Sequence, residues 1–292
     1  MHVSEELERI LAAPLRARAA PATEVPPPFL KWAGGKRWLM PLAVQLRPLG
    51  VKRYIEPFLG SGAMFFGLQP ESALLSDCNV ELIETYQAIA ADWRTVVKHL
   101  RRHDEAHSAQ HYYETRAKRP QTSATRAARF IYLNRTCWNG LYRVNQQGMF
   151  NTPIGTKQRA VLDSDDFQAV AEMLKKAQLT AGDFEDQVNA ARKGDLIFAD
   201  PPYTVRHQFN GFVKYNEQYF SWADQERLHA ALLRAVSRGA TVICTNADHS
   251  SLRDLYQENF TIIPLKRFSS IAGSGGTRGN YAEIVIVGER IP

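Results

Sequence analysis

The chain has 292 residues, which is enough to bury one large core or a core that carries an inserted domain. Hydrophobic residues make up 45% of it and charged residues 23%, as in a typical globular protein. No run of eighteen apolar residues occurs, so the sequence predicts no transmembrane helix. The net charge of +6 favours a polyanionic partner such as nucleic acid, although charge is weak evidence by itself.

The cysteines and the first residues argue against further classes of protein. Cys78, Cys137 and Cys244 are scattered along the chain, and neither a CxxC nor an HExxH spacing occurs. We therefore expect no disulfide framework and no bound metal. The sequence opens without a basic stretch followed by an apolar one, so it does not predict a secretion signal. We expect a cytoplasmic protein with no membrane partner.

The first 28 residues predict an arm outside the core. A short helical stretch is followed by three prolines, Pro26 to Pro28, and we interpret residues 1–28 as a flexible N-terminal arm. The first core strand is expected from Tyr54. It runs into the turn Gly60-Ser61-Gly62, after which a helix is predicted.

The middle of the chain has a different pattern. A second short strand at 73–75 leads to Asp77, and long helical segments are predicted at about 80–103 and 108–135. In 137–160, Asn-Gly and Gln-Gly turns flank short aromatic and β-branched runs, which is typical of a β-hairpin.

From about residue 161 strands and helices alternate again. The expected helices cover 164–175, 184–191, a segment that begins at Ser221 with Asp224 as a weak capping-box partner, and 249–258. The expected strands cover 177–180, 196–199, 241–245, 260–265 and 282–287. Alternation on both sides of the middle region predicts an α/β open sheet with an insertion. We assign the catalytic core to 29–80 and 161–292 and the inserted domain to 81–160.

Gly60-Ser61-Gly62 follows the first strand, where a glycine turn lets backbone amides approach a ligand closely. The third glycine of the dinucleotide-binding pattern GxGxxG is missing, because position 65 is Phe65, so a nicotinamide enzyme is a distant alternative. Taken alone, the pattern predicts a plain tight turn about as well as a ligand-binding loop.

Asp77 follows the second strand, some seventeen residues after Gly60. A carboxylate at that place can accept hydrogen bonds from both hydroxyls of a ribose. Capping of the next helix is the alternative role, and it would be favoured if Asp77 were considered alone. Together with the glycine turn, Asp77 favours a ligand that contains adenosine.

Asp200-Pro201-Pro202-Tyr203 follows the apolar strand 196–199. Two consecutive prolines fix φ and remove two amide donors, so the turn presents carbonyl and carboxylate oxygens. A neighbouring aromatic ring can stack on a flat base while those oxygens accept the hydrogens of its amino group. We therefore favour a site for a planar amine over an ordinary proline turn.

Four segments carry a resemblance to a known family: FLKWAGGK (29–36), IEPFLGSG (55–62), NRTCWNGLYRVNQQGMFNTPIG (134–155) and DPPY (200–203). In this order, they resemble the DNA adenine methyltransferase (Dam) family over residues 29 to about 287. The resemblance implies a Rossmann-like, S-adenosylmethionine-dependent methyltransferase sheet with an inserted helical and β-hairpin target-recognition domain. It implies methyl transfer to the N6 amine of adenine in a specific double-stranded DNA sequence.

The resemblance also implies which residues bind S-adenosylmethionine. Lys36 would lie near its carboxylate, Asp77 would hold its ribose, and Asp183-Phe184 would lie beside its adenine. The full set is Trp32, Lys36, Phe58, Gly60, Asp77, Asp183, Phe184 and Asp200. Taken alone, Trp32 favours a place in the core and Lys36 a solvated surface position.

The implied catalytic residues are Asp200, Pro201, Pro202 and Tyr203. The Asp200 carboxylate and the Pro201 carbonyl would accept the amine hydrogens, which pushes the nitrogen toward sp³ and frees its lone pair. Tyr203 would stack on an adenine flipped out of the duplex. No cysteine adjoins a base-binding motif, which argues against the cysteine-nucleophile route of C5-cytosine enzymes.

Segment 134–155 is expected to contact DNA. Trp138 and Leu141 are predicted to wedge into the base stack and Arg143 to bond guanine O6 and N7 in the major groove. Packing of the two apolar residues and a phosphate contact of Arg143 are equally open alternatives. The predicted DNA-binding set is Trp138, Asn139, Leu141, Arg143 and Pro153.

Several properties stay open in the sequence. Methylation of cytosine N4 or of an RNA base is the rival reaction, and a DNA-binding module with a decayed catalytic site is the rival from another class. Lys266, Arg267 and Arg278 are either phosphate contacts or solvated surface. The recognised DNA sequence is not readable, because Thr156-Lys157-Gln158 departs from the aromatic residue that often follows the family's hairpin. A monomer is our default expectation.

Overall fold

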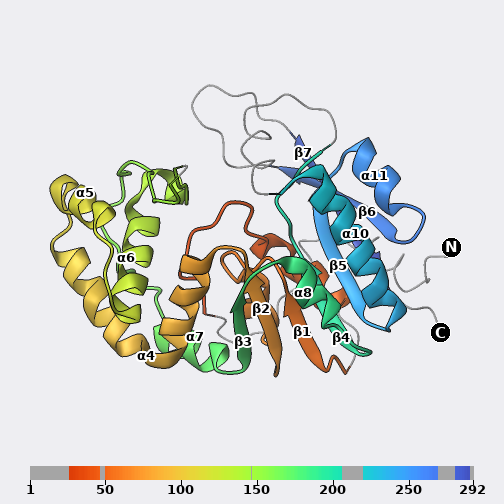
Figure 1. Cartoon of the computed structure of the whole chain (residues 1–292), viewed down its shortest axis with the longest axis horizontal. Helices are drawn as coiled ribbons and strands as arrows, with labels where there is room; N and C mark the ends of the chain where they lie inside the picture. Colours follow the sequence, from red (N-terminus) through yellow and green to blue (C-terminus); the bar gives the residue numbers. More distant parts are fainter. Residues whose placement is uncertain (1–25, 47–49, 146, 206–219, 269–279, 290–292) are drawn as a thin grey trace. The chain divides into compact units, whose positions relative to one another are not determined.

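The computed structural model describes residues 26–46, 50–145, 147–205, 220–268 and 280–289 (Figure 1). Its contacts divide the chain into two compact units. The described residues within Leu42–Phe58 and Asp183–Pro292 form one, which we call the DPPY unit because it contains Asp200–Tyr203. Those within Arg18–Pro41 and Leu59–Gly182 form the other, which we call the glycine-turn unit because it contains Gly60–Gly62.

The DPPY unit contains five strands of a mixed sheet, in the order β1-β4-β5-β7-β6. Strands β1 (Arg53–Glu56), β4 (Asp195–Ala199) and β5 (Thr241–Ala247) are parallel, and β7 (Asn280–Gly288) runs antiparallel between β5 and β6 (Thr261–Phe268). Every residue of β4 is buried, as its continuous apolar run predicts for a parallel strand covered on both faces. Because β1, β4 and β5 are parallel, their carboxyl ends lie at one edge of this sheet.

Three helices flank these strands: α8 (Phe184–Asn189), α10 (Trp222–Ser237) and α11 (Ser250–Tyr256). Helix α10 packs against α8, β5 and β7, and Figure 1 shows it running alongside β5. The predicted capping box at its start is confirmed, because Ser221 Oγ accepts the Asp224 amide and the Asp224 carboxylate accepts the Ser221 amide. The first turn of α10 is thereby fixed.

The glycine-turn unit contains the parallel strands β2 (Ala73–Asp77) and β3 (Ala177–Ala181). The short helix α3 (Ala63–Leu68) follows the glycine turn, and α7 (Phe167–Leu174) precedes β3. With the parallel strands and flanking helices of both units, the predicted α/β class is confirmed. The remaining short elements are η2 (Arg37–Leu39) and α2 (Met40–Leu46).

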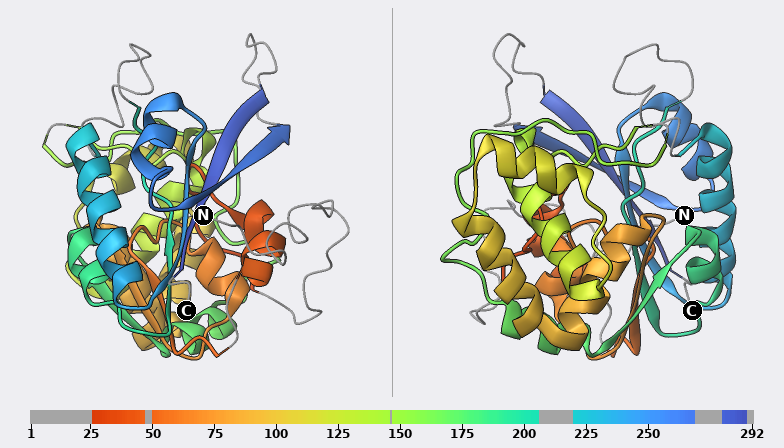
Figure 2. Two further views of the ribbon diagram at one scale, coloured as in Figure 1. Left: turned by 90° about the vertical axis from the view of Figure 1, so that its right-hand side faces the viewer. Right: turned by 60° about the vertical axis from the view of Figure 1, so that its left-hand side comes forward.

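Three longer helices fill much of the segment between β2 and β3: α4 (Val80–Glu105), α5 (Ala109–Ala117) and α6 (Ser123–Thr136). Helices α4 and α6 lie side by side in both views of Figure 2 and make extensive contact. The prediction of one helical segment over 108–135 is wrong at its centre, because α5 ends at Ala117 and α6 begins only at Ser123. Pro120 cannot donate a helix hydrogen bond, and Thr122 caps α6 by accepting the Thr125 amide.

The described residues of 137–160 form the predicted β-hairpin only in part: the Asn145 amide donates to the Met149 carbonyl and the Asn151 amide to the Arg143 carbonyl, but no continuous ladder extends from this pair. They contain the 3-10 turn η3 (Trp138–Gly140) and two isolated antiparallel bridges, Cys137 with Ile154 and Val144 with Phe150. Side chains accept or donate where a ladder would need backbone partners: the Thr152 hydroxyl donates to the Leu141 carbonyl, and the Tyr112 hydroxyl to the Thr152 carbonyl. The segment is therefore an irregular hairpin whose outer part is braced by side chains.

The predicted N-terminal arm and the predicted basic loop around Arg278 lie largely outside the described residues. Pro26 is buried, while the rest of the arm up to residue 25 lies outside those residues, as does Arg278 and the glycine-serine loop before it. The division into a core and an insert at 81–160 stays a prediction. No helix in the described residues combines the length and apolar character that a bilayer crossing requires.

Candidate active site

The glycine turn is built so tightly that only glycine fits. Gly60 has a φ of 49° and Gly62 a φ of 65°. A Cβ on Gly60 would lie 2.7 Å from Cδ1 of Trp32, inside van der Waals contact. Two hydrogen bonds hold the backbone where the turn begins. The Leu59 amide donates to the Ser76 carbonyl at 2.9 Å, and the Tyr86 hydroxyl donates to the Gly60 carbonyl at 2.9 Å.

Asp77 is part of the same turn. Its Oδ2 accepts the Gly60 amide at 3.0 Å and its Oδ1 accepts the Asn79 amide at 3.0 Å. The carboxyl group is buried, and burial raises its pKa above the ordinary value. The alternative role as helix cap is wrong, because the Asn79 side chain caps α4 by accepting the Leu82 amide. Asp77 holds the backbone of the glycine turn in place.

Trp32 and Lys36 lie in the loop before η2. The Trp32 ring stacks on Tyr142 at 5.6 Å and on Phe130 at 6.4 Å between centroids, and it stays half-buried. Lys36 is buried, with its Nζ donating to the Gly34 carbonyl at 2.8 Å. The solvated alternative for Lys36 is therefore wrong, because its side chain is buried and its amino group bonds the Gly34 carbonyl.

An aromatic cluster lies at the end of β1 in the DPPY unit. Phe58 stacks on Phe184 at 5.3 Å between ring centroids and meets Phe220 edge-on at 5.5 Å. Phe184 and Phe220 are buried, while Phe58 is half-buried. Of the predicted cofactor residues, Phe58 and Phe184 are thus in direct contact.

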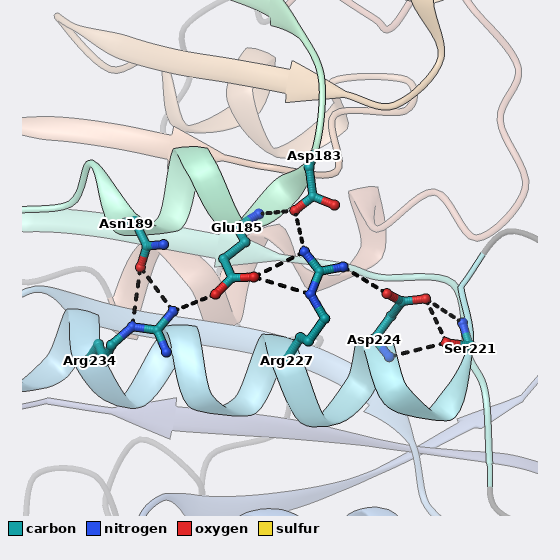
Figure 3. A network of polar contacts seen from close by, with 7 residues as sticks. All are labelled: Asp183, Glu185, Asn189, Ser221, Asp224, Arg227 and Arg234. Carbon is teal, nitrogen blue, oxygen red and sulfur yellow. Dashed lines mark hydrogen bonds and ion pairs between the residues drawn. The ribbon is translucent and has the colours of Figure 1, made fainter.

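Asp183 precedes Phe184 and caps α8. Its Oδ1 accepts the Glu185 amide at 2.9 Å and an Arg227 guanidinium hydrogen at 2.9 Å (Figure 3). Within the part of the chain that the structure describes, Oδ2 makes no hydrogen bond. This oxygen can accept a hydrogen bond from a ligand.

Asp200 and Tyr203 belong to one polar group at the end of β4. The Thr245 hydroxyl of β5 donates to Asp200 Oδ1 at 2.5 Å, and the Tyr203 hydroxyl donates to Glu283 Oε2 of β7 at 2.9 Å. Burial raises the pKa of Tyr203 well above its usual range, and the carboxylates of Asp200 and Glu283 raise it further. Tyr203 therefore stays protonated, and its hydroxyl acts as a donor that fixes the ring.

The proline pair supports this arrangement. Pro201 is buried and Pro202 is half-buried, so the turn after β4 stays packed against the protein and does not project into solvent. Neither proline has an amide hydrogen, so the turn has two fewer backbone donors that could compete for its acceptors. The predicted catalytic tetrapeptide is therefore a rigid group of acceptors and one ring.

The predicted DNA-binding residues are accessible. Trp138 is 53% exposed, and Asn139, Arg143 and Pro153 are exposed as well, while Leu141 is half-exposed. Packing in the core is therefore wrong as the alternative for Trp138. The Trp138 amide donates to the Pro153 carbonyl at 2.9 Å, which brings the two ends of the loop together.

Arg143 has a defined partner in the same loop. Its Nε donates to Asn151 Oδ1 at 2.7 Å, and the Asn151 amide donates to the Arg143 carbonyl at 3.0 Å. Nη2 approaches the Asn151 carbonyl at 3.4 Å. The guanidinium is held along one edge while the side chain remains exposed.

Two residues at the end of α6 join the loop of Trp32 to the rest of this unit. Asn134 exchanges two hydrogen bonds of 2.8 Å with the backbone of Lys31. Arg135 donates to the Phe29 carbonyl at 2.8 Å and forms a buried bidentate ion pair with Asp165 at 2.6 and 2.7 Å. Asn134 and Arg135 therefore set where Trp32 lies.

Sequence reasoning did not find five residues of these groups: Asn134, Arg135, Asn151, Thr245 and Glu283. The first three belong to the segment 134–155, whose length and polar content were the available signal. Thr245 and Glu283 had no sequence signal, because they reach the tetrapeptide only through the pairing of β5 with β4 and β7.

Comparison with known proteins gives the family. The model of the D12 class N6 adenine-specific DNA methyltransferases matches residues 32–271, which is most of the chain. The chain belongs to this D12 class. As a D12 enzyme it uses S-adenosylmethionine as the methyl donor and methylates the N6 amine of adenine in DNA. The expected family, reaction and cofactor are thus confirmed.

Three relatives of this D12 enzyme match along most of their length. The Type II methyltransferase M1.LlaDCHI of Lactococcus lactis subsp. cremoris is 32% identical, over 89% of this chain and 94% of its own. M.MjaIII of Methanocaldococcus jannaschii is 31% identical over 89% and 98%. The DNA adenine methylase of Salmonella typhi is 31% identical over 88% and 93%.

Solved structures are more distant. A putative RNA methyltransferase from Pyrococcus horikoshii has 9% identity and a TM-score of 0.38, covering 99% of this chain and 100% of its own. A putative class I S-adenosylmethionine-dependent methyltransferase from Listeria monocytogenes has the same identity and TM-score.

The residues of the D12 enzyme fit an adenosine-containing methyl donor. Gly60 has no room for a Cβ, Asp183 has an unused carboxylate oxygen among the described residues, and Phe58 keeps part of its ring exposed. In the DPPY unit, Asp183 and Phe58 are an acceptor and a flat apolar surface of the kind that an adenine needs, and in the glycine-turn unit Gly60 allows a ligand to approach the backbone closely. In the same described residues, no three His, Cys, Asp or Glu side chains gather as metal ligands would.

Proposed function

We propose that the enzyme flips adenine out of a specific double-stranded DNA sequence and holds its amine at Asp200-Pro201-Pro202-Tyr203. The observation that carries this proposal is the polar group of Asp200, Thr245, Tyr203 and Glu283, which fixes a carboxylate and an aromatic ring next to each other in the chain. S-adenosylmethionine supplies an electrophilic methyl group, and the chain's own residues hold and prepare the amine.

Asp200 prepares the amine for attack. The lone pair of an exocyclic amine is delocalised into the purine ring, which makes the nitrogen a weak nucleophile. Asp200 and the Pro201 carbonyl accept its two hydrogens and favour a pyramidal nitrogen. As the new N–C bond forms in place of the methyl–sulfur bond, positive charge grows on nitrogen; the Asp200 carboxylate stabilises that charge, and the surplus amine proton then passes to solvent.

Tyr203 holds the flipped base. Extruding a base costs a few kcal/mol, and stacking on an aromatic ring returns about 1–3 kcal/mol. The bond from Tyr203 to Glu283 supports this role, because it fixes the ring before the base arrives. Tyr203 does not take the proton from the amine, since its own hydroxyl stays protonated.

The predicted cofactor residues divide by the part of the molecule that they recognise. Lys36 is a buried cation suited to the carboxylate of the methionine moiety. Asp77 holds the glycine turn and keeps lone pairs for the ribose hydroxyls. Asp183 and Phe184, with Phe58, form the environment for the adenine, and Trp32 closes on Gly60.

The loop 137–155 contacts the DNA target. Exposed Trp138 and half-exposed Leu141 are apolar groups suited to the gap that a flipped base leaves. Arg143 bonds a guanine edge, and Asn139 and Pro153 lie in the same loop. We assign target recognition to 81–160, catalysis to 29–80 and 161–292, and a monomeric, cytoplasmic enzyme to the whole chain.

The replacement Asp200→Ala tests the proposal. With duplex DNA and saturating S-adenosylmethionine, we expect tritium transfer to fall by at least about a thousandfold, as for loss of a group that acts on the reacting atom. Digestion of the wild-type product should yield N6-methyladenine and no N4-methylcytosine. The control Asp254→Ala removes an exposed carboxylate from α11 and should keep full activity.

Circular dichroism of Asp200→Ala should match the wild type, since Thr245, whose hydroxyl bonds Asp200, is a neutral residue and leaves no buried charge behind. A folded Asp200→Ala protein with wild-type transfer would refute the role of Asp200. A wild-type product methylated on cytosine would refute the choice of base.

A further inference from the structure

Arg227 lies at the centre of a charged network that joins α8 to α10 (Figure 3). Its guanidinium donates to Asp183 Oδ1 at 2.9 Å, to Glu185 Oε2 at 3.0 and 3.1 Å, and to Asp224 Oδ1 at 2.9 Å. One side chain thus bonds three carboxylates on two elements. This fork geometry is available to arginine and not to lysine.

Arg227 also contacts the residue after Asp183. Its guanidinium carbon lies 5.0 Å from the centroid of the Phe184 ring, which is within the range of a cation–π contact. Arg227 therefore touches both Asp183 and Phe184, the two residues expected beside the adenine of the cofactor. No other charged side chain in the described residues contacts both of them.

The start of α10 holds Arg227 in its place. Asp224 forms the capping box with Ser221 and at the same time accepts a bond from Arg227 one turn later. The guanidinium is thus anchored on its own helix before it reaches α8. Without it, Arg234 would be the one remaining cation in the described residues that bonds any of the carboxylates of Asp183, Glu185 and Asp224, and it bonds Glu185 alone of the three.

We propose that Arg227 is a positioning residue for the cofactor: it turns the Asp183 carboxylate so that Oδ1 is occupied and Oδ2 accepts a hydrogen bond from the amino group of the cofactor's adenine. This inference rests on the proposed role of Asp183. The cap bond from the Glu185 amide and the bond from Arg227 converge on Oδ1, which leaves Oδ2 to the ligand.

Calorimetry with the reaction product S-adenosylhomocysteine and with one analogue of it tests the proposal without any turnover. S-adenosylhomocysteine carries the amino group, and S-inosylhomocysteine has a carbonyl oxygen in its place. We expect the wild type to bind the first about tenfold more tightly, which corresponds to one hydrogen bond to a charged group. In Arg227→Gln this preference should fall to about twofold or less, with the affinity for S-inosylhomocysteine little changed.

Arg234→Gln is the matched control. Arg234 lies two turns further along α10 and bonds Glu185 and Asn189, and among the residues drawn no hydrogen bond or ion pair joins it to Asp183 (Figure 3). This variant should keep the tenfold preference. Arg227→Lys should keep part of it, because one ammonium restores the charge but not the fork, and this milder variant also serves if Arg227→Gln does not fold.

Asp183→Ser separates the inference from the function beneath it, because serine keeps the cap of α8 and removes the second oxygen. If Asp183→Ser loses the preference while Arg227→Gln keeps it, Asp183 recognises adenine unaided and the inference is overturned. An equal loss of the preference in Arg227→Gln and Arg234→Gln would also overturn it, because the effect would then come from the general packing of α10 and not from the contact of Arg227 with Asp183. If Asp183→Ser itself keeps the preference, the proposed role of Asp183 fails.

Discussion

Thr245 and Glu283 show how single side chains give the catalytic turn its geometry. Cys244 pairs with Ala199, so the next residue of β5, Thr245, lies opposite Asp200 and donates its hydroxyl to Asp200 Oδ1. Asp200 was predictable because its motif is local. Thr245 was not, since its role depends on a strand register that joins residues 45 positions apart.

Replacing Thr245 by valine keeps the shape of the side chain and removes its donor. We expect kcat to fall about tenfold at saturating substrates, because the carboxylate loses one hydrogen bond that fixes its rotamer. KM for S-adenosylmethionine should change less. Thr245→Ser, which retains the hydroxyl, should recover most of the activity in the same steady-state assay, and an unaltered kcat in Thr245→Val would contradict the role.

At the scale of elements, the α/β alternation was readable and the recognition loop was not. Strand and helix periodicity placed β4, α10 and the glycine turn close to where they lie. The loop 137–155 differs, because some of its backbone carbonyls accept hydrogen bonds from side chains distant in the sequence. The Leu141 carbonyl accepts the Thr152 hydroxyl, and the Thr152 carbonyl accepts the hydroxyl of Tyr112 in α5. Local turn residues predict a hairpin and cannot reveal such distant donors.

Arg143 in this loop should determine specificity. Because Asn151 holds one edge of its guanidinium, Arg143 presents a fixed fork to a base. Arg143→Ala should cost about 1–3 kcal/mol of discrimination at one base pair. Competition binding with a set of single-base variants measures it. Lys157→Ala, which removes an exposed charge nearby, is the control and should weaken all sequences alike. A uniform loss in Arg143→Ala would indicate a phosphate contact.

At the scale of the whole molecule, a histidine cluster couples stability to pH. His103 Nδ1 lies 3.0 Å from His111 Nε2, and His107 Nδ1 lies 2.9 Å from the Tyr132 hydroxyl. Burial, together with the neighbouring His111, lowers the pKa of His103 to about 4. Burial lowers the pKa of His111 as well. The folded protein therefore disfavours protons that the unfolded chain accepts.

The sign follows from that difference. An unfolded histidine binds its proton near pH 6.5, so the free energy of unfolding should fall as the pH drops from about 6.5 to about 4. Above that window the contribution is complete. His103→Gln removes the titrating group, and urea unfolding followed by circular dichroism should show a shallower loss over the same window. An identical pH profile in this variant would contradict the assignment to His103.

The proposed mechanism requires that adenine be methylated at the acceptor turn of residue 200. The most direct measurement is sequencing that detects modified bases in DNA from a methylation-free host expressing this chain or its Asp200→Ala variant. We predict N6-methyladenine at one defined sequence with the wild type and none with the variant. Modified adenines that persist in the variant, or a wild type that modifies another base, would contradict the account.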